Sequence, residues 1–359
     1  MGSMTKSTTY FFEDKPLFGL DIGHSSLRVM QLDSGSKLPR LIGYGTASFD
    51  PSCIVDGIIE KPEVIAKAAQ DLFKRNLIGD ITTKRVAVAL PVAHAFTRTL
   101  RLPELSEKET AEAVRTEAEQ YIPAAIDDLY LDYSRPKSDT KNESELFLVA
   151  MPKRIVDSYL VLTRLLGLEA VLFETSIGAG AQLFARDEQS DVPSVLVDIG
   201  SDSADITVYN GGLLVSGTVA GGGEQITSLL ADSLHVTKAE AAIIKTKYGL
   251  GYSKKQPQIE NALSPVLGLL TKEIKRTIRY YEERSGSKQT IGQIIIMGGG
   301  ANMPGLSEYL TNNLRVAVRA FDPTAYINFG HLQPINETER MSYVTVAGLG
   351  LTNPKEVFA

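Results

Sequence analysis

Two short segments of the chain pair a carboxylate with a turn of small residues. In each, an apolar strand ends in Asp-Ile-Gly and is followed by small polar residues and a second strand; these segments begin at Phe18 and Val195. Each pattern predicts a β-hairpin with an acid at its lip. Backbone N–H groups in such turns converge on anions, and Mg²⁺ prefers carboxylate and water oxygens. Because one hairpin opens each half of the chain, the pair predicts a phosphate and Mg²⁺ site between the halves.

The candidate ligands lie on and beside the two turns. The predicted metal ligands are Asp21 and Asp198. The predicted phosphate-binding residues are Gly23, His24, Ser25, Ser26 and Arg28 in the first hairpin, and Gly200, Ser201, Asp202 and Ser203 in the second. Either hairpin alone would be interpreted as an ordinary turn, since aspartate and glycine are common there. Their occurrence as a pair favours phosphate binding.

Two glycine-rich turns follow in the second half. A strand of isoleucines ends in Gly298, Gly299 and Gly300, with Asn302 and Met303 just beyond. A backbone without side chains can lie flat against an adenine or ribose ring. The other turn contains Gly222, Gly223 and Glu224, and its acid could accept hydrogen bonds from ribose hydroxyls. Alone, the first turn is weak evidence, and the second is equally consistent with the capping of a helix.

Length and composition narrow the class of protein. At 359 residues the chain is long enough for two or more domains of roughly 150 residues. The net charge of −6 and pI near 5.4 give no basic footprint for nucleic acid. Cys53 is the only cysteine, which excludes an intrachain disulfide and a cluster held by several cysteines. No apolar run reaches the roughly 18 residues that a membrane-spanning helix needs, so we expect a cytoplasmic protein.

The chain between the two hairpins contains an insertion. Strands and helices in the order ββαββα are predicted from Arg85 to Leu166. A helix from Glu174 to Ala185 leads into the second hairpin, and the later predicted helices cover 225–234, 238–248, 264–285 and 344–351. Residues 251–261 are predicted to form a polar loop before Ser264 and Pro265 begin the long helix.

Taken in order, these motifs resemble the actin, Hsp70 and sugar-kinase ATPase superfamily over residues 17–351. The resemblance implies an α/β fold of two duplicated actin-like domains that bind ATP with Mg²⁺. It also implies that Glu174, together with Asp21 and Asp198, is catalytic, with Glu174 orienting the attacking water for slow hydrolysis. An acid at a helix N-terminus is equally expected from the helix dipole alone. Lys272, Lys275 and Arg276 would contact the adenosine, although solvated charges on an exposed face are the simpler interpretation.

The insertion in the first half is similar to that of the cell-division protein FtsA and, more closely, of the PilM type IV pilus assembly family. Segments that carry this second resemblance begin at Gly19, Glu117 and Tyr130, and His24 departs from the usual serine. The resemblance implies a scaffold at the inner membrane of a pilus, secretion or DNA-uptake machine. Its groove, between the core and the insertion, would bind the N-terminal cytoplasmic tail of a PilN-like membrane protein. That partner would be the only link to the membrane.

The implied division of the chain follows the motifs. Its parts are an N-terminal arm (1–16), subdomain 1A (17–84 and 172–190), an inserted α+β subdomain 1C (85–171), a second domain (191–351, with 2B about 225–290) and a tail (352–359). The peptide groove is expected beside the strands over 86–91 and 96–102 and the helix over 106–121.

Two other functions stay open from the sequence. An FtsA-like scaffold would form filaments with ATP, which sedimentation would detect. A small-molecule kinase would transfer phosphate to a sugar or acid, and no substrate-side base for that reaction is found in the sequence. A pilus motor ATPase and a second copy of the chain are further candidate partners.

Overall fold

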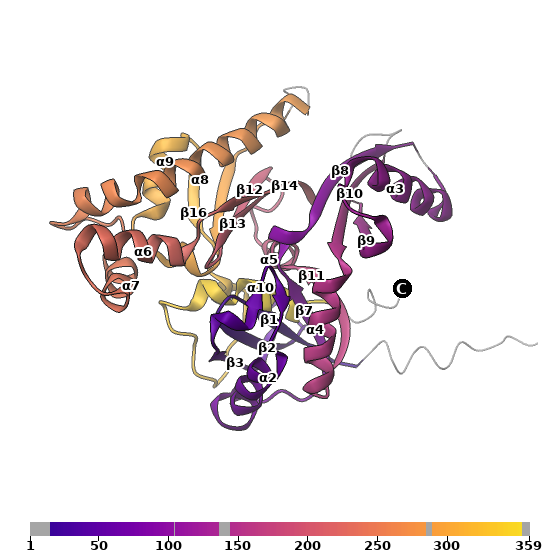
Figure 1. Ribbon diagram of the computed structural model, residues 1–359, viewed down its shortest axis with the longest axis horizontal. Coiled ribbons are helices and arrows are strands. Elements are labelled where there is room, and N and C mark those ends of the chain that lie inside the picture. The colour runs from indigo at the N-terminus through magenta and orange to yellow at the C-terminus, as the bar shows by residue number, and fades with distance from the viewer. Residues whose placement is uncertain (1–14, 104, 136–143, 285–288, 354–359) are drawn as a thin grey trace, which may run out of the picture.

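The computed structural model describes residues 15–103, 105–135, 144–284 and 289–353. The predicted arm and tail, part of the insertion and the predicted end of the long helix lie largely outside these ranges. Within them the chain forms two α/β halves, with the insertion at one end of the long axis and α6 and α7 at the other (Figure 1). None of the helices in the described ranges has the length and apolar character to cross a bilayer.

The first half is built on a six-stranded sheet in the order β11-β7-β1-β2-β3-β6. Both predicted segments of the first hairpin are strands of this sheet, paired antiparallel so that Asp21 lies opposite Arg28. The strands are β1 (Phe18–Ile22), β2 (Ser26–Asp33), β3 (Arg40–Ser48), β6 (Ile78–Gly79), β7 (Arg85–Leu90) and β11 (Glu169–Thr175). The short strands β4 (Ile54–Val55) and β5 (Ile58–Ile59) pair separately. Helices α2 (Pro62–Asp71) and α4 (Lys153–Leu165) pack together beside the sheet.

The inserted subdomain is smaller than the sequence predicts. Its sheet has the order β8-β10-β9, from β8 (Phe96–Leu102), β9 (Leu129–Ser134) and β10 (Ser144–Pro152). Helix α3 (Glu107–Tyr121) covers one face, and a capping box of Ser106 and Glu109 begins it. The first predicted strand, β7, pairs instead with β1 and β11 in the core sheet, and α4 packs on the core. Strand β7 is buried along its whole length and apolar after Arg85, which suits a central strand, because strands covered on both faces read as nearly continuous apolar runs.

The second half repeats the first with a five-stranded sheet in the order β14-β13-β12-β15-β16. Its strands are β12 (Ser194–Ile199), β13 (Ser203–Tyr209), β14 (Leu213–Ala220), β15 (Gln293–Met297) and β16 (Ala317–Ala320). The accompanying helices are α6 (Gly223–Leu234), α7 (Lys238–Lys247), α8 (Gln256–Arg284) and α9 (Leu306–Leu314). The second predicted hairpin is β12–β13, in which Asp198 lies opposite Asp205.

Helices α5 (Ser176–Phe184) and α10 (Val344–Gly350) pack against one another at the junction of the halves. They contribute to one apolar core that contains residues of both sheets, including Met30 and Ile295. Their backbones approach closely because Gly348 faces the Ala179 carbonyl, and a methyl group on that glycine would overlap the oxygen. The small residues of the last helix therefore allow α5 and α10 to pack closely.

The long helix begins earlier than the sequence predicts. Helix α8 begins at Gln256 and contains Pro265, which was expected in its first turn. Proline removes one N–H from a helix and leaves a carbonyl one turn earlier without its usual donor. Here the Ser264 hydroxyl donates to the Asn261 carbonyl at 3.0 Å. That hydrogen bond explains how residues predicted as a loop continue the helix.

Candidate functional site

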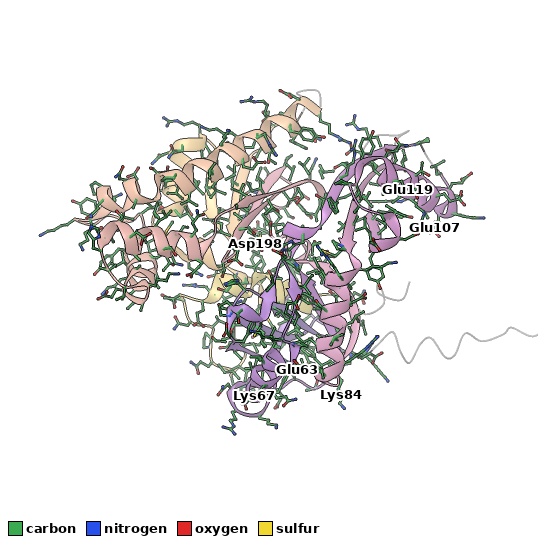
Figure 2. The ribbon with its side chains drawn as sticks, viewed as in Figure 1. Glu63, Lys67, Lys84, Glu107, Glu119 and Asp198 are labelled. Carbon is green, nitrogen blue, oxygen red and sulfur yellow. The ribbon has the colours of Figure 1, made fainter. Side chains whose placement is uncertain are left out.

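The two hairpins line one cavity of about 760 Å³ between the halves of the chain. In each hairpin the glycine of Asp-Ile-Gly closes the turn with its backbone N–H. Gly23 donates to the Ser26 carbonyl and Gly200 to the Ser203 carbonyl, both at 2.9 Å. Asp198 lies near the centre of the molecule, where the halves meet (Figure 2). We call this space the hairpin cavity. It brings together two motifs that are about 180 residues apart in the sequence.

The carboxyl groups of the hairpin cavity repel one another. Burial raises the pKa of Asp198 to about 7, and the nearby charges of Asp205 and Asp21 add to the effect. Burial also raises the pKa of Asp205 to about 6, against a hydrogen bond from Thr218 at 2.6 Å. Burial raises the pKa of Asp21, partly offset by Arg28, whose Nη1 lies 3.7 Å from the carboxylate. A cation in this cavity would relieve the repulsion.

The donor set suits a hydrated cation. In the described ranges there is no group of three or more His, Cys, Asp or Glu side chains arranged to hold a metal. Mg²⁺ usually keeps several waters and takes one or two protein carboxylates together with phosphate oxygens. Asp21 and Asp198 meet that requirement.

A direct contact joins the hairpins across the cavity. The His24 Nδ1 atom lies 2.8 Å from a carboxylate oxygen of Asp202. The two side chains are 32% and 61% exposed, so both are accessible to a ligand. His24 is also the residue at which the first hairpin departs from the pattern of the family that it resembles. A ligand that reaches both turns would meet this pair.

Most of the predicted ligands line the hairpin cavity. They are Asp21, Gly23, His24, Ser26, Arg28, Asp198, Gly200, Ser201, Asp202, Ser203, Gly223, Glu224, Gly298, Gly299 and Gly300. Gly298 has a φ of 82°, and a side chain there would overlap the Asp198 carboxylate. That glycine therefore allows the isoleucine strand to end against the acid.

The other predicted ligands do not line this cavity. Gly222 packs against the backbone of Ser201, and Ser25 uses its carbonyl to accept the Phe49 N–H. The Asn302 side chain donates to the Gly299 carbonyl at 3.2 Å. The Met303 side chain is buried in the apolar core of the second half.

The three charges predicted to contact adenosine lie on the exposed side of α8. Lys272, Lys275 and Arg276 are exposed, because the neighbouring Leu270 and Ile274 turn the other side of the helix toward the core. Arg276 forms an ion pair with Glu273 of the same helix. The structure therefore does not bring these cations to the hairpin cavity.

Sequence reasoning missed two charged residues of the hairpin cavity. Asp205 is the strand partner of Asp198, as Arg28 is of Asp21, so aligning the hairpins residue by residue would have found it. Lys245, on α7, donates to the Gly223 carbonyl and the Thr227 hydroxyl, both at 2.8 Å. Burial lowers the pKa of Lys245, and Glu224 opposes that effect. No motif surrounds this lysine, and only the fold places it beside the glycine turn.

Glu174 lies in a different cavity from the other predicted catalytic acids. It is the second-last residue of β11 and does not begin α5, contrary to prediction; α5 is instead capped by the Thr175 hydroxyl. Asp21 and Glu174 lie at the same level of the sheet, on the two strands that flank β7. Two strand spacings therefore separate their backbones by about 10 Å. Glu174 is therefore not part of the hairpin cavity.

The second cavity, of about 720 Å³, lies between the insertion's sheet and the core, and we call it the insertion cavity. Alternate residues of β10 divide between the two faces of the sheet. Leu146 and Leu148 pack under α3, whereas Phe147, Val149 and Met151 line the cavity. The opposite wall comes from β11 and α5, and the turn from Tyr209 to Leu213 adds a contribution from the second half.

The insertion cavity does not follow the borders predicted for the peptide groove. The insertion cavity uses the face of the β8-β10-β9 sheet that α3 does not cover, and of the predicted borders only Leu90 lines it. Strand β8 and helix α3 line a smaller cavity of about 370 Å³.

Comparisons with known proteins agree with this architecture. The family model for the type IV pilus assembly protein PilM matches residues 19–353. The cell division protein FtsA of Bacillus subtilis (strain 168) is 26% identical over 239 residues, which cover 58% of this chain and 54% of FtsA. The chain thus spans about half the length of this curated relative.

Solved structures support the same fold. A PilM–PilN type IV pilus biogenesis complex has a TM-score of 0.80 at 24% identity, covering 94% of this chain and 98% of the other. EutJ, an ethanolamine utilization protein from Carboxydothermus hydrogenoformans, has a TM-score of 0.56 at 17% identity, covering 94% and 91%. MreB 5 of Spiroplasma citri bound to AMPPNP has a TM-score of 0.51 at 12% identity, covering 94% and 95%. These likenesses confirm the predicted actin-like fold.

Proposed function

The chain belongs to the family of type IV pilus assembly proteins PilM, and we propose that it is a nucleotide-binding scaffold for the N-terminal tail of a PilN-like membrane protein. The main support for this proposal is the presence of two separate cavities of different chemistry. The molecule has a polar cavity between two acidic hairpins and a separate, largely apolar cavity beside the inserted sheet. The first suits a nucleotide and the second suits a peptide.

In this proposal the hairpin cavity binds ATP. Backbone N–H groups of the two turns donate to the phosphates, and the flat turn from Gly298 to Gly300 accommodates the adenosine. Asp21 and Asp198 hold Mg²⁺, which when bound supplies positive charge against the triphosphate. Lys245 adds a cation on the far side of Gly223. A similar fold is known with AMPPNP bound, in MreB 5.

The insertion cavity binds the tail of the partner. The solved PilM–PilN complex supports a PilN-like partner but not a particular cavity, so the chemistry of the walls is the basis for this assignment. Apolar surface for alternate side chains of an extended peptide is offered by Phe147, Val149, Met151 and Leu160. The scaffold would then reach the cytoplasmic side of the inner membrane through its partner.

Both cavities depend on the same elements, which gives a physical basis for coupling. Glu174 lines the insertion cavity and Ser176, two residues later, lines the hairpin cavity. Strand β13 likewise carries Asp205 near its start and Tyr209 at its end, one in each cavity. A nucleotide that changes the angle between the halves would therefore move one wall of the insertion cavity.

Replacing Val149 with arginine is expected to weaken binding of the tail at least tenfold, because a long charged side chain would occupy the insertion cavity. The measurement is isothermal titration with a synthetic peptide of the first 20 or so residues of the PilN-like protein from the same genome. Val64→Arg makes the same change at an exposed position of α2, outside both cavities, and should bind normally. Equal affinity of the two variants would exclude the insertion cavity as the tail's site.

A further inference from the structure

The insertion cavity has an unbalanced charge. Two carboxylates, Glu174 and Asp132, are among the described residues that line it, and no lysine, arginine or histidine is. Asp132 lies on β9 directly opposite Val149 of β10, and so on the face that lines the cavity. The acids come from opposite walls, one from the insertion and one from the core. Asp132 is exposed, whereas Glu174 is half-buried, so the charge of Glu174 is the one that is costly unless it is paired.

The Glu174 carboxylate is held in one orientation by its own strand end. Its Oε1 atom accepts the Thr175 N–H at 2.7 Å and the Thr175 hydroxyl at 3.0 Å. Gly178 lies against the same oxygen, where any larger residue would displace it. The other oxygen, Oε2, has no hydrogen-bond partner among the described residues. A fixed carboxylate with one free oxygen is prepared for a donor from outside the chain.

We propose that the insertion cavity recognises an arginine side chain in the partner's tail, which pairs with Glu174 between apolar anchor residues. The inference rests on the proposed binding of that tail. It adds a specificity-determining residue, since the apolar walls alone would accept many hydrophobic peptides.

Arginine suits this site better than the other cations of a peptide. The guanidinium ion is weakly hydrated, so it loses less on entering an apolar cavity than a compact ammonium ion does. Its planar fork can donate to Oε2 of Glu174, and the negative charge of Asp132 on the opposite wall adds to the attraction for the cation. Burial raises the pKa of Glu174, and Asp132 adds to that effect, which a bound cation would reverse.

The test is a double-mutant cycle with the synthetic tail peptide. The protein variant is Glu174→Gln, which keeps the acceptor for Thr175 and removes the charge. The peptide variants replace each arginine in turn with citrulline, a neutral side chain of the same shape. Titration of both proteins with all peptides separates the pair from general loss of binding. Asp128→Asn is the matched protein control, because that acid is exposed on the insertion outside the cavity.

We expect one citrulline peptide to bind wild-type protein at least tenfold more weakly than the natural peptide, and Glu174→Gln to lose the same factor. That citrulline substitution should cost the Glu174→Gln variant less than threefold, whereas Asp128→Asn should behave as wild type. If the natural peptide binds wild type but every citrulline effect persists in Glu174→Gln, the arginine inference is wrong. If a peptide with an acetylated N-terminus loses affinity only with intact Glu174, the cation is the terminal amine and the inference is wrong. If the natural peptide binds neither protein, the proposed function itself fails.

Discussion

Replacing Asp198 with asparagine is expected to weaken Mg²⁺-dependent binding of ATP by roughly 10- to 100-fold, the range found when groups that support a metal are removed. Asp198 is the central acid of the hairpin cavity and faces both Asp21 and Asp205. Titration with ATP in the presence and absence of Mg²⁺ measures the effect. Asp232→Asn, at an exposed position on α6, removes the same charge away from the cavity and should leave the affinity unchanged. Equal affinity of wild type and Asp198→Asn would mean that the metal site is misplaced.

The same substitution should stabilise the protein without nucleotide. The pKa of Asp198 is raised to about 7 in the folded state, against about 3.9 for an unfolded chain. Between these values the folded state binds more protons than the unfolded state, so the free energy of unfolding falls as pH rises through this range. Asparagine removes this loss and should raise the free energy of unfolding by on the order of 2 kcal/mol at pH 8, with little change at pH 4. Urea unfolding at the two pH values checks the sign, and a variant that is less stable than wild type at pH 8 would contradict it.

The second large effect concerns the packing between α5 and α10. Gly348→Ala is expected to lower the free energy of unfolding by about 3 kcal/mol, because the added methyl group would overlap the Ala179 carbonyl and rigid backbone would have to shift. Gly268 offers a matched control on α8, where nothing lies within 4 Å of the position of a new methyl group. Gly268→Ala should stabilise the protein by roughly 0.5–1 kcal/mol, since alanine favours a helix over glycine.

Urea unfolding followed by circular dichroism compares these two variants. Opposite signs are the expected result. Similar effects of the two substitutions would show that α5 and α10 are not packed as closely as described. Because both helices also contribute to the core shared by the two halves, a weakened Gly348 variant should bind nucleotide less tightly as well.

The parts of the site that the sequence predicted are those set by local backbone chemistry. The hairpins could be found because strand, glycine turn and return strand follow one another directly, as they do from Asp21 to Arg28. The flat turn at Gly298 was predictable for the same reason. The overall fold followed from the order of these motifs along the chain, through resemblance to known ATPases.

The parts that it missed depend on contacts between distant segments. Lys245 reaches the hairpin cavity only because α7 packs beside α6, and no residue near it indicates this. Lys275 lies on the exposed side of α8, outside the hairpin cavity, because the core that a helix covers sets the direction of its faces. Glu174 was assigned to a helix start, whereas its place beside β7 turns it toward the insertion cavity. Pro265 was interpreted as a helix start because the hydrogen bond from Ser264 that accommodates it has no sequence signature.

We propose that one molecule binds a nucleotide in the hairpin cavity and a membrane protein's tail in the insertion cavity, and that the two cavities are coupled. The most direct measurement is a pair of isothermal titrations with the tail peptide, one without nucleotide and one with saturating ATP and Mg²⁺. We expect micromolar or tighter binding in at least one state and an affinity that differs between states by about fivefold or more, the lower end of typical coupling. Because coupling is reciprocal, the peptide should change the affinity for ATP by the same factor. No binding of the peptide in either state would contradict the proposed binding of the tail and its coupling to the nucleotide.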